Sequence, residues 1–156
     1  MVDKKYMLNS LQMAEFVARG MLRFDELVPN EINQAVMDAI DAGTITSHPA
    51  GTPLSECYPE PSPIGQVLRM PEVQGIIQSL VGPDPLFDHH AIHVRKPYEG
   101  KAQGMHGDSI IDTRMHFDVQ LMYFPHDVPL EMGGTLVVPG SHFRRINEMD
   151  IARYQK

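Results

Sequence analysis

The chain has 156 residues, 42% of them hydrophobic, and a formal net charge of -7. This predicts one globular domain, residues 1–156, with enough apolar material for a core. The negative charge argues against nucleic acid or an anionic membrane surface as a partner, because both attract basic proteins. No apolar run approaches the roughly 20 residues of a membrane helix. One cysteine, Cys57, and no apolar leader favour a reducing, cytoplasmic location.

A first helix is expected over residues 10–19. Asn9 or Ser10 can cap its start, and Gly20 is a natural left-handed stop. The apolar side chains between these signals recur at helical spacing. A brief strand is then expected over residues 21–25.

Two further helices are expected in the first 83 residues. Pro29 suits the first turn of one, which ends at Gly43, and Pro71 starts the other, which stops at Gly82. Between them, residues 44–63 contain five prolines and no apolar period, which predicts a loop without regular structure. Long loops are often functional, so we expect this one to act as a lid beside a substrate cavity.

Extended segments follow from residue 84 to residue 156. Alternating or β-branched residues predict strands over 87–96, 115–124 and 134–138. Because helices come first and strands second, the predicted class is α+β with a mainly β core.

His106-Gly107-Asp108 is the motif with the clearest chemistry. Two side chains separated by one residue on extended chain lie on the same side, so an imidazole and a carboxylate can bind one metal ion. A site of two histidines and one carboxylate leaves open positions on iron for a co-substrate and oxygen. A polar surface loop can contain the same short pattern, and spacing alone does not decide between these readings.

A second pair with the same spacing occurs at His116 and Asp118. These residues share a strand face with Gln120 and Met122, so the pair that does not bind metal either lines the same cavity or faces solvent. His142 has the chemistry of a metal ligand. A histidine after Pro-Gly-Ser, however, more often hydrogen-bonds to backbone.

The order of four segments resembles the phytanoyl-CoA dioxygenase family of iron(II)- and 2-oxoglutarate-dependent oxygenases. These segments are residues 91–97, 106–108, 119–122 and 134–142. The hairpin that ends in Pro139-Gly140-Ser141-His142 is the most diagnostic of them.

The resemblance implies a double-stranded β-helix, also called a jelly roll or cupin-like fold, with N-terminal helices outside it. It implies hydroxylation of a small organic substrate with iron(II) as cofactor and 2-oxoglutarate as co-substrate. It also selects His106 and Asp108 as metal ligands, because the family's pair precedes the strand that leads to the hairpin. His116 and Asp118 fall inside that strand.

The resemblance also suggests residues near the co-substrate. Gln120 and Met122 match positions that face the cavity in relatives, and Gln103 is a further candidate. Relatives often carry an aromatic residue where Met122 stands, and another where Met105 stands, so co-substrate packing is expected to differ here.

Two expected parts of the site have no counterpart in the sequence. In the family a second metal histidine, and an arginine that grips 2-oxoglutarate bidentately, follow some tens of residues after the hairpin. The sequence runs to Lys156. The resemblance therefore implies an N-terminal piece of a longer oxygenase, inactive alone unless a missing segment or a partner chain completes it. The alternative is a non-catalytic jelly-roll module that binds a small molecule or another subunit.

Overall fold

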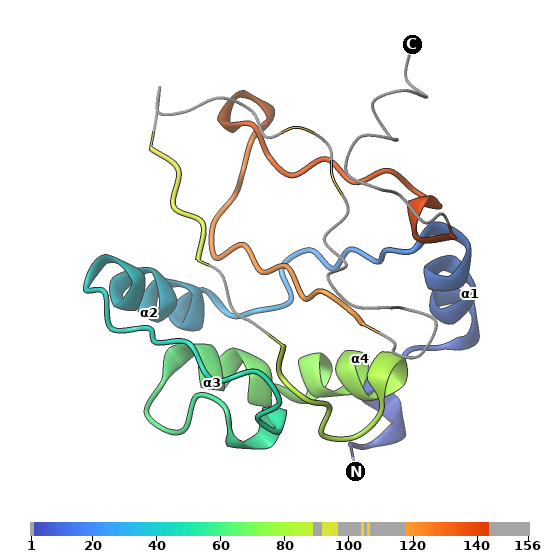
Figure 1. Cartoon of the computed structure of the whole chain (residues 1–156), viewed down its shortest axis with the longest axis horizontal. Helices are drawn as coiled ribbons and strands as arrows, with labels where there is room; N and C mark the ends of the chain where they lie inside the picture. The colour runs from blue at the N-terminus through green and yellow to red at the C-terminus, as the bar shows by residue number, and fades with distance from the viewer. Residues whose placement is uncertain (1, 89–91, 97–103, 105, 107–117, 144–156) are drawn as a thin grey trace. The chain divides into compact units, whose positions relative to one another are not determined.

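The computed structural model describes residues 2–88, 92–96, 104, 106 and 118–143 (Figure 1). The chain divides into two compact units. The first unit consists of Met1–Leu8, Phe24–His93 and Val119–Asp127, and the second of Asn9–Arg23, Val94–Asp118 and Val128–Lys156. The helices are α1 (Ser10–Arg19), α2 (Asn30–Asp41), α3 (Pro63–Arg69) and α4 (Pro71–Val81). Four short 3-10 turns are η1 (Lys4–Tyr6), η2 (Leu54–Glu56), η3 (Leu130–Met132) and η4 (Ser141–Phe143).

Local capping explains α1, and the helix predicted over residues 10–19 is confirmed. The Asn9 side chain accepts the Gln12 N–H at 2.9 Å, and the Gln12 side chain accepts the Asn9 N–H at 3.0 Å. This reciprocal pair is a capping box. At the other end, Gly20 takes the left-handed conformation with φ of 75° and donates its N–H to the Phe16 carbonyl.

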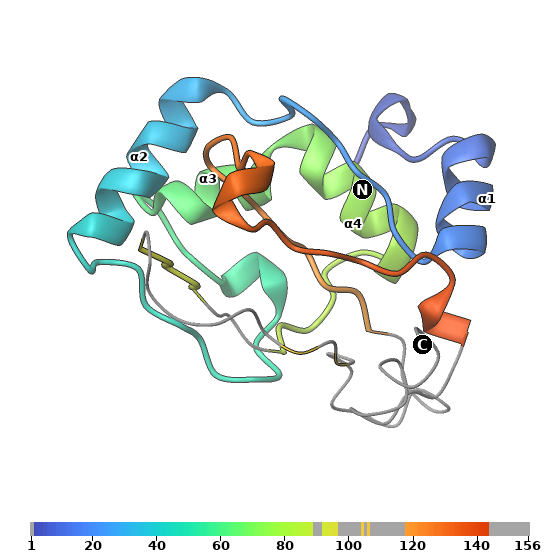
Figure 2. The same ribbon diagram turned by 90° about the horizontal axis from the view of Figure 1, so that it is seen from above.

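Three helices enclose the core of the first unit. Val36 of α2, Val67 of α3 and Val73 of α4 are buried together. Helix α3 contacts both α2 and α4, and η1 contacts α4 (Figures 1 and 2). Partly buried side chains packed against these valines are Leu27, Val28, Ile32, Ile40, Ile45, Ile64, Met70, Ile77 and Tyr123. The two helices predicted near Pro29 and Pro71 are confirmed by α2 and α4.

Helix α3 was not predicted, because its start lies in the proline-rich stretch. Pro63 occupies the first turn, where a missing N–H costs no intrahelical hydrogen bond. The Ser62 side chain caps this helix by accepting the Gly65 N–H. None of the helices in the described ranges combines the length and apolar character needed to cross a bilayer.

The predicted α+β fold with a jelly-roll core is wrong. The described structure is helical, and within it the one β-bridge joins Pro53 to Leu86. The segments predicted as strands, 21–25, 87–96, 115–124 and 134–138, form no ladder wherever the structure describes them. Residues 89–91 and 115–117 of these segments lie outside the described ranges.

The failure of the strand prediction has a physical reason. β-Branched and aromatic residues favour extended chain, but a strand also needs a neighbouring backbone and a face to bury. In residues 119–124 Tyr123 is half-buried, but Leu121, Met122 and Phe124 are all exposed, so neither side of the segment is buried as a face. Leu136, in the third predicted strand, is also exposed. The residues of these segments therefore favour an extended backbone, but their described parts do not pair into a sheet.

Candidate functional site

His106 is exposed, and a backbone contact orients its ring. Its Nδ1 lies 2.8 Å from the Gly104 carbonyl oxygen. A carbonyl oxygen can only accept, so Nδ1 carries the proton and Nε2 is the basic nitrogen of the neutral ring. Metal-binding histidines commonly donate their other ring N–H to a carbonyl or carboxylate in this way. The tautomer of His106, with the proton on Nδ1, is therefore the one in which Nε2 can bind a metal ion.

The other predicted metal ligand, Asp108, lies outside the described residues. His116 of the second pair and Gln103, a candidate for contact with the co-substrate, also lie outside them. Asp118, from the second pair, is described and exposed. Over the ranges that the structure describes, no three His, Cys, Asp or Glu side chains are grouped to hold a metal ion. Of the predicted metal pair, the structure therefore describes the side chain of His106 and not that of Asp108.

Gln120 and Met122 are exposed in the first unit, on a segment that the neighbouring Tyr123 anchors. Tyr123 donates its hydroxyl to Asn33 Oδ1 at 2.5 Å, and Asn33 donates its amide to the Val28 carbonyl at 3.2 Å. Burial raises the pKa of Tyr123 to about 12. Sequence reasoning missed this anchor, although the alternation around Tyr123 was the available signal.

His142 closes the C-terminal end of α1 within the second unit. Its Nε2 lies 2.9 Å from the Val17 carbonyl oxygen, and the Gly140 N–H donates to the Arg19 carbonyl at 2.8 Å. Both carbonyls belong to the last turn of α1, where no further helical N–H reaches them. The Pro-Gly-Ser-His element thus acts as a helix cap, and His142 bonds to backbone, as its position after Pro-Gly-Ser favours.

Gly20→Ala is expected to lower the free energy of unfolding by about 2 kcal/mol. An alanine at φ of 75° is strained, and its Cβ would lie 2.1 Å from Nδ1 of His142. The ring would have to move away, and its hydrogen bond to Val17 would be lost. Chemical denaturation followed by circular dichroism measures the loss.

Gly43→Ala is the matched control, because it separates backbone strain from the contact. Gly43 has φ of 64°, and an added methyl group would have no other atom within 4 Å, so only the strain applies. We expect a loss of about 1 kcal/mol. Adding His142→Ala to Gly20→Ala should cost little more. Equal losses for the two glycine variants would contradict the contact between Gly20 and His142.

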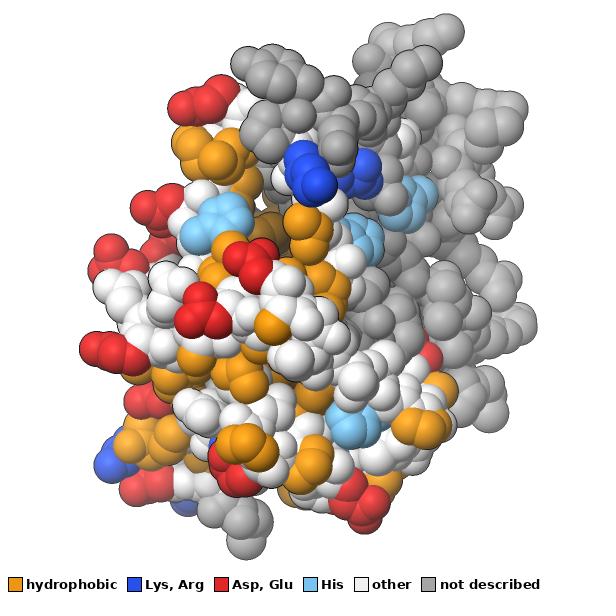
Figure 3. Space-filling view, turned by 90° about the vertical axis from the view of Figure 1, so that its left-hand side faces the viewer, with side chains coloured by type: hydrophobic (Ala, Val, Ile, Leu, Met, Phe, Trp, Pro, Cys, Tyr) orange, Lys and Arg blue, Asp and Glu red, His pale blue; other side chains and the backbone are white. Residues whose placement is uncertain are grey.

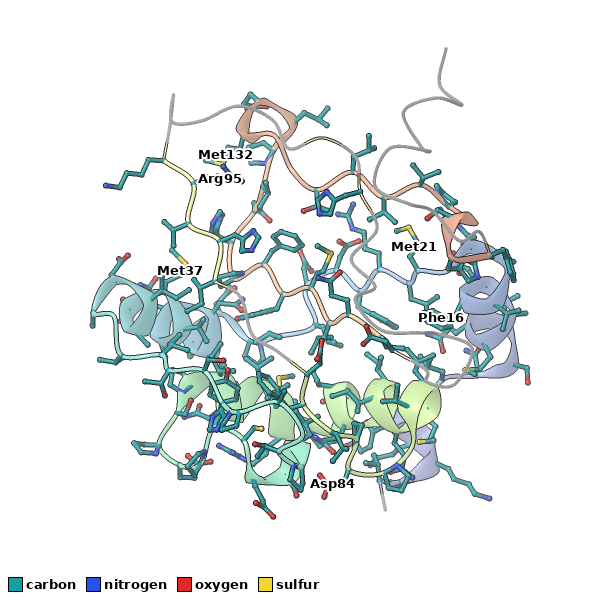
Figure 4. All side chains as sticks on the ribbon, viewed as in Figure 1. Phe16, Met21, Met37, Asp84, Arg95 and Met132 are labelled. Atoms are coloured by element: carbon teal, nitrogen blue, oxygen red, sulfur yellow. The ribbon has the colours of Figure 1, made fainter. Side chains whose placement is uncertain are left out.

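The proline-rich segment (residues 44–63) is held against residues 84–87, which sequence reasoning did not foresee. Asp84 follows the end of α4 and is labelled in Figure 4. Its carboxylate accepts the Ser55 N–H at 2.7 Å and the Ser55 hydroxyl at 2.8 Å. Backbone bonds run from Gly51 N–H to Phe87, from Phe87 N–H to Thr52 and from Leu54 N–H to Pro85, at 2.8, 2.8 and 2.9 Å. The segment therefore has a defined conformation in the first unit.

Tyr58 is the most constrained residue of this segment. It is buried and has φ of 52°, a left-handed conformation that is unusual for a bulky side chain. Its N–H donates to Nε2 of His48 at 2.9 Å, and its carbonyl accepts from Arg69 at 2.9 Å. Arg69 also pairs with Glu60. Burial, with a smaller effect of neighbouring Cys57, raises the pKa of Tyr58 to about 12.

A hollow of about 370 Å³ lies beside α4 in the first unit. Its lining residues are Val2, Gln74, Ile77, Gln78, Gly82, Pro83 and Asp84. None of them is a predicted site residue. Asp84 is already engaged by Ser55, and Gln78 accepts the Val2 N–H at 3.0 Å. The hollow is therefore lined by none of the predicted metal ligands.

Comparison of the chain with models of protein families, with curated proteins and with solved structures finds no match in any of the three. The class that the described structure defines is a helical protein with two compact units. Its candidate site is marked by an exposed histidine, His106, with a backbone-set tautomer.

Proposed function

We propose that the chain contributes His106 and Asp108 to the iron(II) centre of a 2-oxoglutarate-dependent oxygenase that hydroxylates a small organic substrate. The observation that carries the proposal is the hydrogen bond from Nδ1 of His106 to the Gly104 carbonyl, in a histidine that precedes an aspartate by two positions. Such a bond raises the basicity of Nε2 and restricts rotation of the ring.

Each residue has a separate part in this proposal. His106 binds the metal through Nε2, and Asp108 supplies a carboxylate oxygen, a pairing typical of iron sites with open positions. Bound iron would supply, with 2-oxoglutarate and oxygen, the oxidation of a substrate C–H bond. Gln120 and Met122, both exposed, are accessible to a co-substrate, and Gln103 is a further candidate. A second histidine, from a further segment or a partner chain, would complete the ligand set.

Cobalt(II) titration of the 156-residue protein tests the proposal. Cobalt(II) resembles iron(II) in ligand preference, and its paramagnetism displaces the NMR signals of the ring that it binds. We expect the His106 signals to respond at the lowest metal concentration. Asp108→Ala should weaken the affinity at least about tenfold, because it removes one of two converging ligands.

His126→Ala is the matched control for adventitious binding to an exposed imidazole. His126 is also exposed, and its Nδ1 lies 2.7 Å from the Asp127 carbonyl, but no carboxylate stands two residues later. We expect His126→Ala to leave the cobalt affinity unchanged and His106→Ala to lower it. Equal effects of the two histidine variants would contradict a built metal site at His106.

A second candidate function is a non-catalytic module that binds a small molecule or a protein partner. The observation that favours it is the exposure of Leu121, Met122 and Phe124 on one segment. Figure 3 shows exposed hydrophobic side chains interspersed with acidic ones on one face of the molecule. A response to cobalt(II) that depends on Asp108 would separate the metal site from this module.

A cytoplasmic location is part of the same proposal. The chain has one cysteine, Cys57, which is buried and free. Iron(II) stays reduced most readily in a reducing compartment, where free thiols also persist.

A further inference from the structure

His48 differs from three other described histidines in the direction of its ring hydrogen bond. His106, His126 and His142 each place a ring nitrogen on a carbonyl oxygen, so that nitrogen donates. Nε2 of His48 instead accepts the backbone N–H of Tyr58 at 2.9 Å. Both nitrogens of a protonated imidazole are donors. Protonation therefore abolishes the His48 bond, whereas it leaves the bonds of the other three rings in place.

The His48 bond holds a strained and buried turn. Tyr58 has φ of 52°, a conformation that persists only where surrounding contacts enforce it. Its N–H is held by His48 and its carbonyl by Arg69. With a protonated ring, two N–H donors would face each other beside buried aromatic groups, and the Tyr58 N–H would lose its acceptor. The left-handed turn would then lose one of its two backbone restraints.

The surroundings of His48 are aromatic and partly charged. Its ring packs edge-on against the rings of Tyr58 and Phe87, with centroids 4.4 and 6.1 Å away. The titratable or charged groups on the segments packed around it are Glu56, Cys57, Tyr58, Glu60, Arg69, Asp84 and Asp88. Glu60 pairs with Arg69, and Asp84 binds Ser55. These two carboxylates are thus engaged by groups other than the His48 ring.

We propose that His48 is a proton-operated latch for the proline-rich segment. The neutral ring holds the left-handed turn at Tyr58 closed, and protonation releases the Tyr58 N–H and opens this turn beside Cys57. Only the neutral ring can accept the Tyr58 N–H, because both nitrogens of a protonated imidazole donate. Acid therefore favours opening of the turn.

The reactivity of Cys57 reports the opening, because it is the one cysteine of the chain and lies next to Tyr58. Its side chain is 2% exposed in the closed segment. We would measure its rate with an aromatic disulfide that stays reactive in acid, relative to the rate in the denatured chain at the same pH. This ratio is the protection factor, and it removes most of the pH dependence of the thiol itself. We expect the factor to fall about tenfold between about pH 7.5 and pH 5.5.

His48→Gln is the decisive variant and His142→Gln is its matched control. A glutamine oxygen at position 48 can accept the Tyr58 N–H but takes up no proton in this range, so the protection factor of His48→Gln should be independent of pH. If His48→Gln keeps the circular dichroism spectrum of the wild type but is unprotected at every pH, the bond from Tyr58 to the ring is itself required for the closed turn, which supports the latch. His142→Gln should keep the wild-type fall. A wild-type protection factor that does not fall in acid would overturn the latch. So would the same fall in His48→Gln, or the absence of the fall in His142→Gln.

Discussion

Gly65→Ala is expected to lower the free energy of unfolding of the first unit by about 3 kcal/mol, although alanine is the better helix former. In the interior of α3, helix propensity alone would favour alanine by about 1 kcal/mol. Packing opposes this, because the new Cβ would lie 2.0 Å from the Tyr58 carbonyl oxygen and 2.5 Å from the Arg69 guanidinium. Both backbone bonds of Tyr58, to Arg69 and to His48, would be strained or lost.

Urea denaturation of Gly65→Ala beside Gly104→Ala tests the sign of this effect. Gly104 has nothing within 4 Å of its added methyl position and no left-handed φ, so its substitution should change stability by about 0.5 kcal/mol or less. A Gly65→Ala protein as stable as the wild type, or more stable, would contradict the close approach of α3 to the Tyr58 carbonyl.

Val36→Asp is expected to abolish cooperative folding of the first unit, at a cost of at least about 4 kcal/mol. Val36 is 0% exposed and belongs to one buried cluster with Val67 and Val73. A carboxylate there would be removed from water without a basic partner among the described core side chains. Near-UV circular dichroism measures the loss, because Tyr123 packs against the same cluster.

Leu11→Asp makes the same kind of change at an exposed position. Leu11 is 78% exposed in the first turn of α1, where a negative charge suits the helix dipole. We expect its stability to stay within about 0.5 kcal/mol of the wild type. An intact near-UV spectrum in Val36→Asp would show that the three valines are not the core of the first unit.

Short-range signals account for the helices that the sequence predicts correctly. The capping box of Asn9 with Gln12 and the left-handed Gly20 delimit α1 through contacts only three or four residues apart. Pro71 and Gly82 delimit α4 in the same way. The prolines around Pro63 favour a loop and hide the start of helix α3, although proline is well tolerated in a first helical turn.

Longer-range contacts account for the errors. The alternation in residues 119–124 favours extended chain, but it cannot specify a pairing partner, and of these residues Tyr123 packs against the core while Leu121 is exposed. Likewise, the prolines at positions 49 to 61 disfavour an α-helix over that stretch, yet they give no sign that Asp84 binds Ser55 from 29 residues away. The jelly roll was expected from a family resemblance that joined such segments into a sheet.

The candidate site also depends partly on short-range sequence signals and partly on long-range contacts. The sequence by itself determined the helix limits, the apolar faces and the presence of an imidazole and a carboxylate two residues apart at His106 and Asp108. Only the tertiary structure decided that His48 accepts a hydrogen bond from Tyr58, 10 residues away, and that His142 meets the Val17 carbonyl, 125 residues away. The physical reason is that a ring nitrogen takes its role as donor or acceptor from the backbone group that folding brings to it.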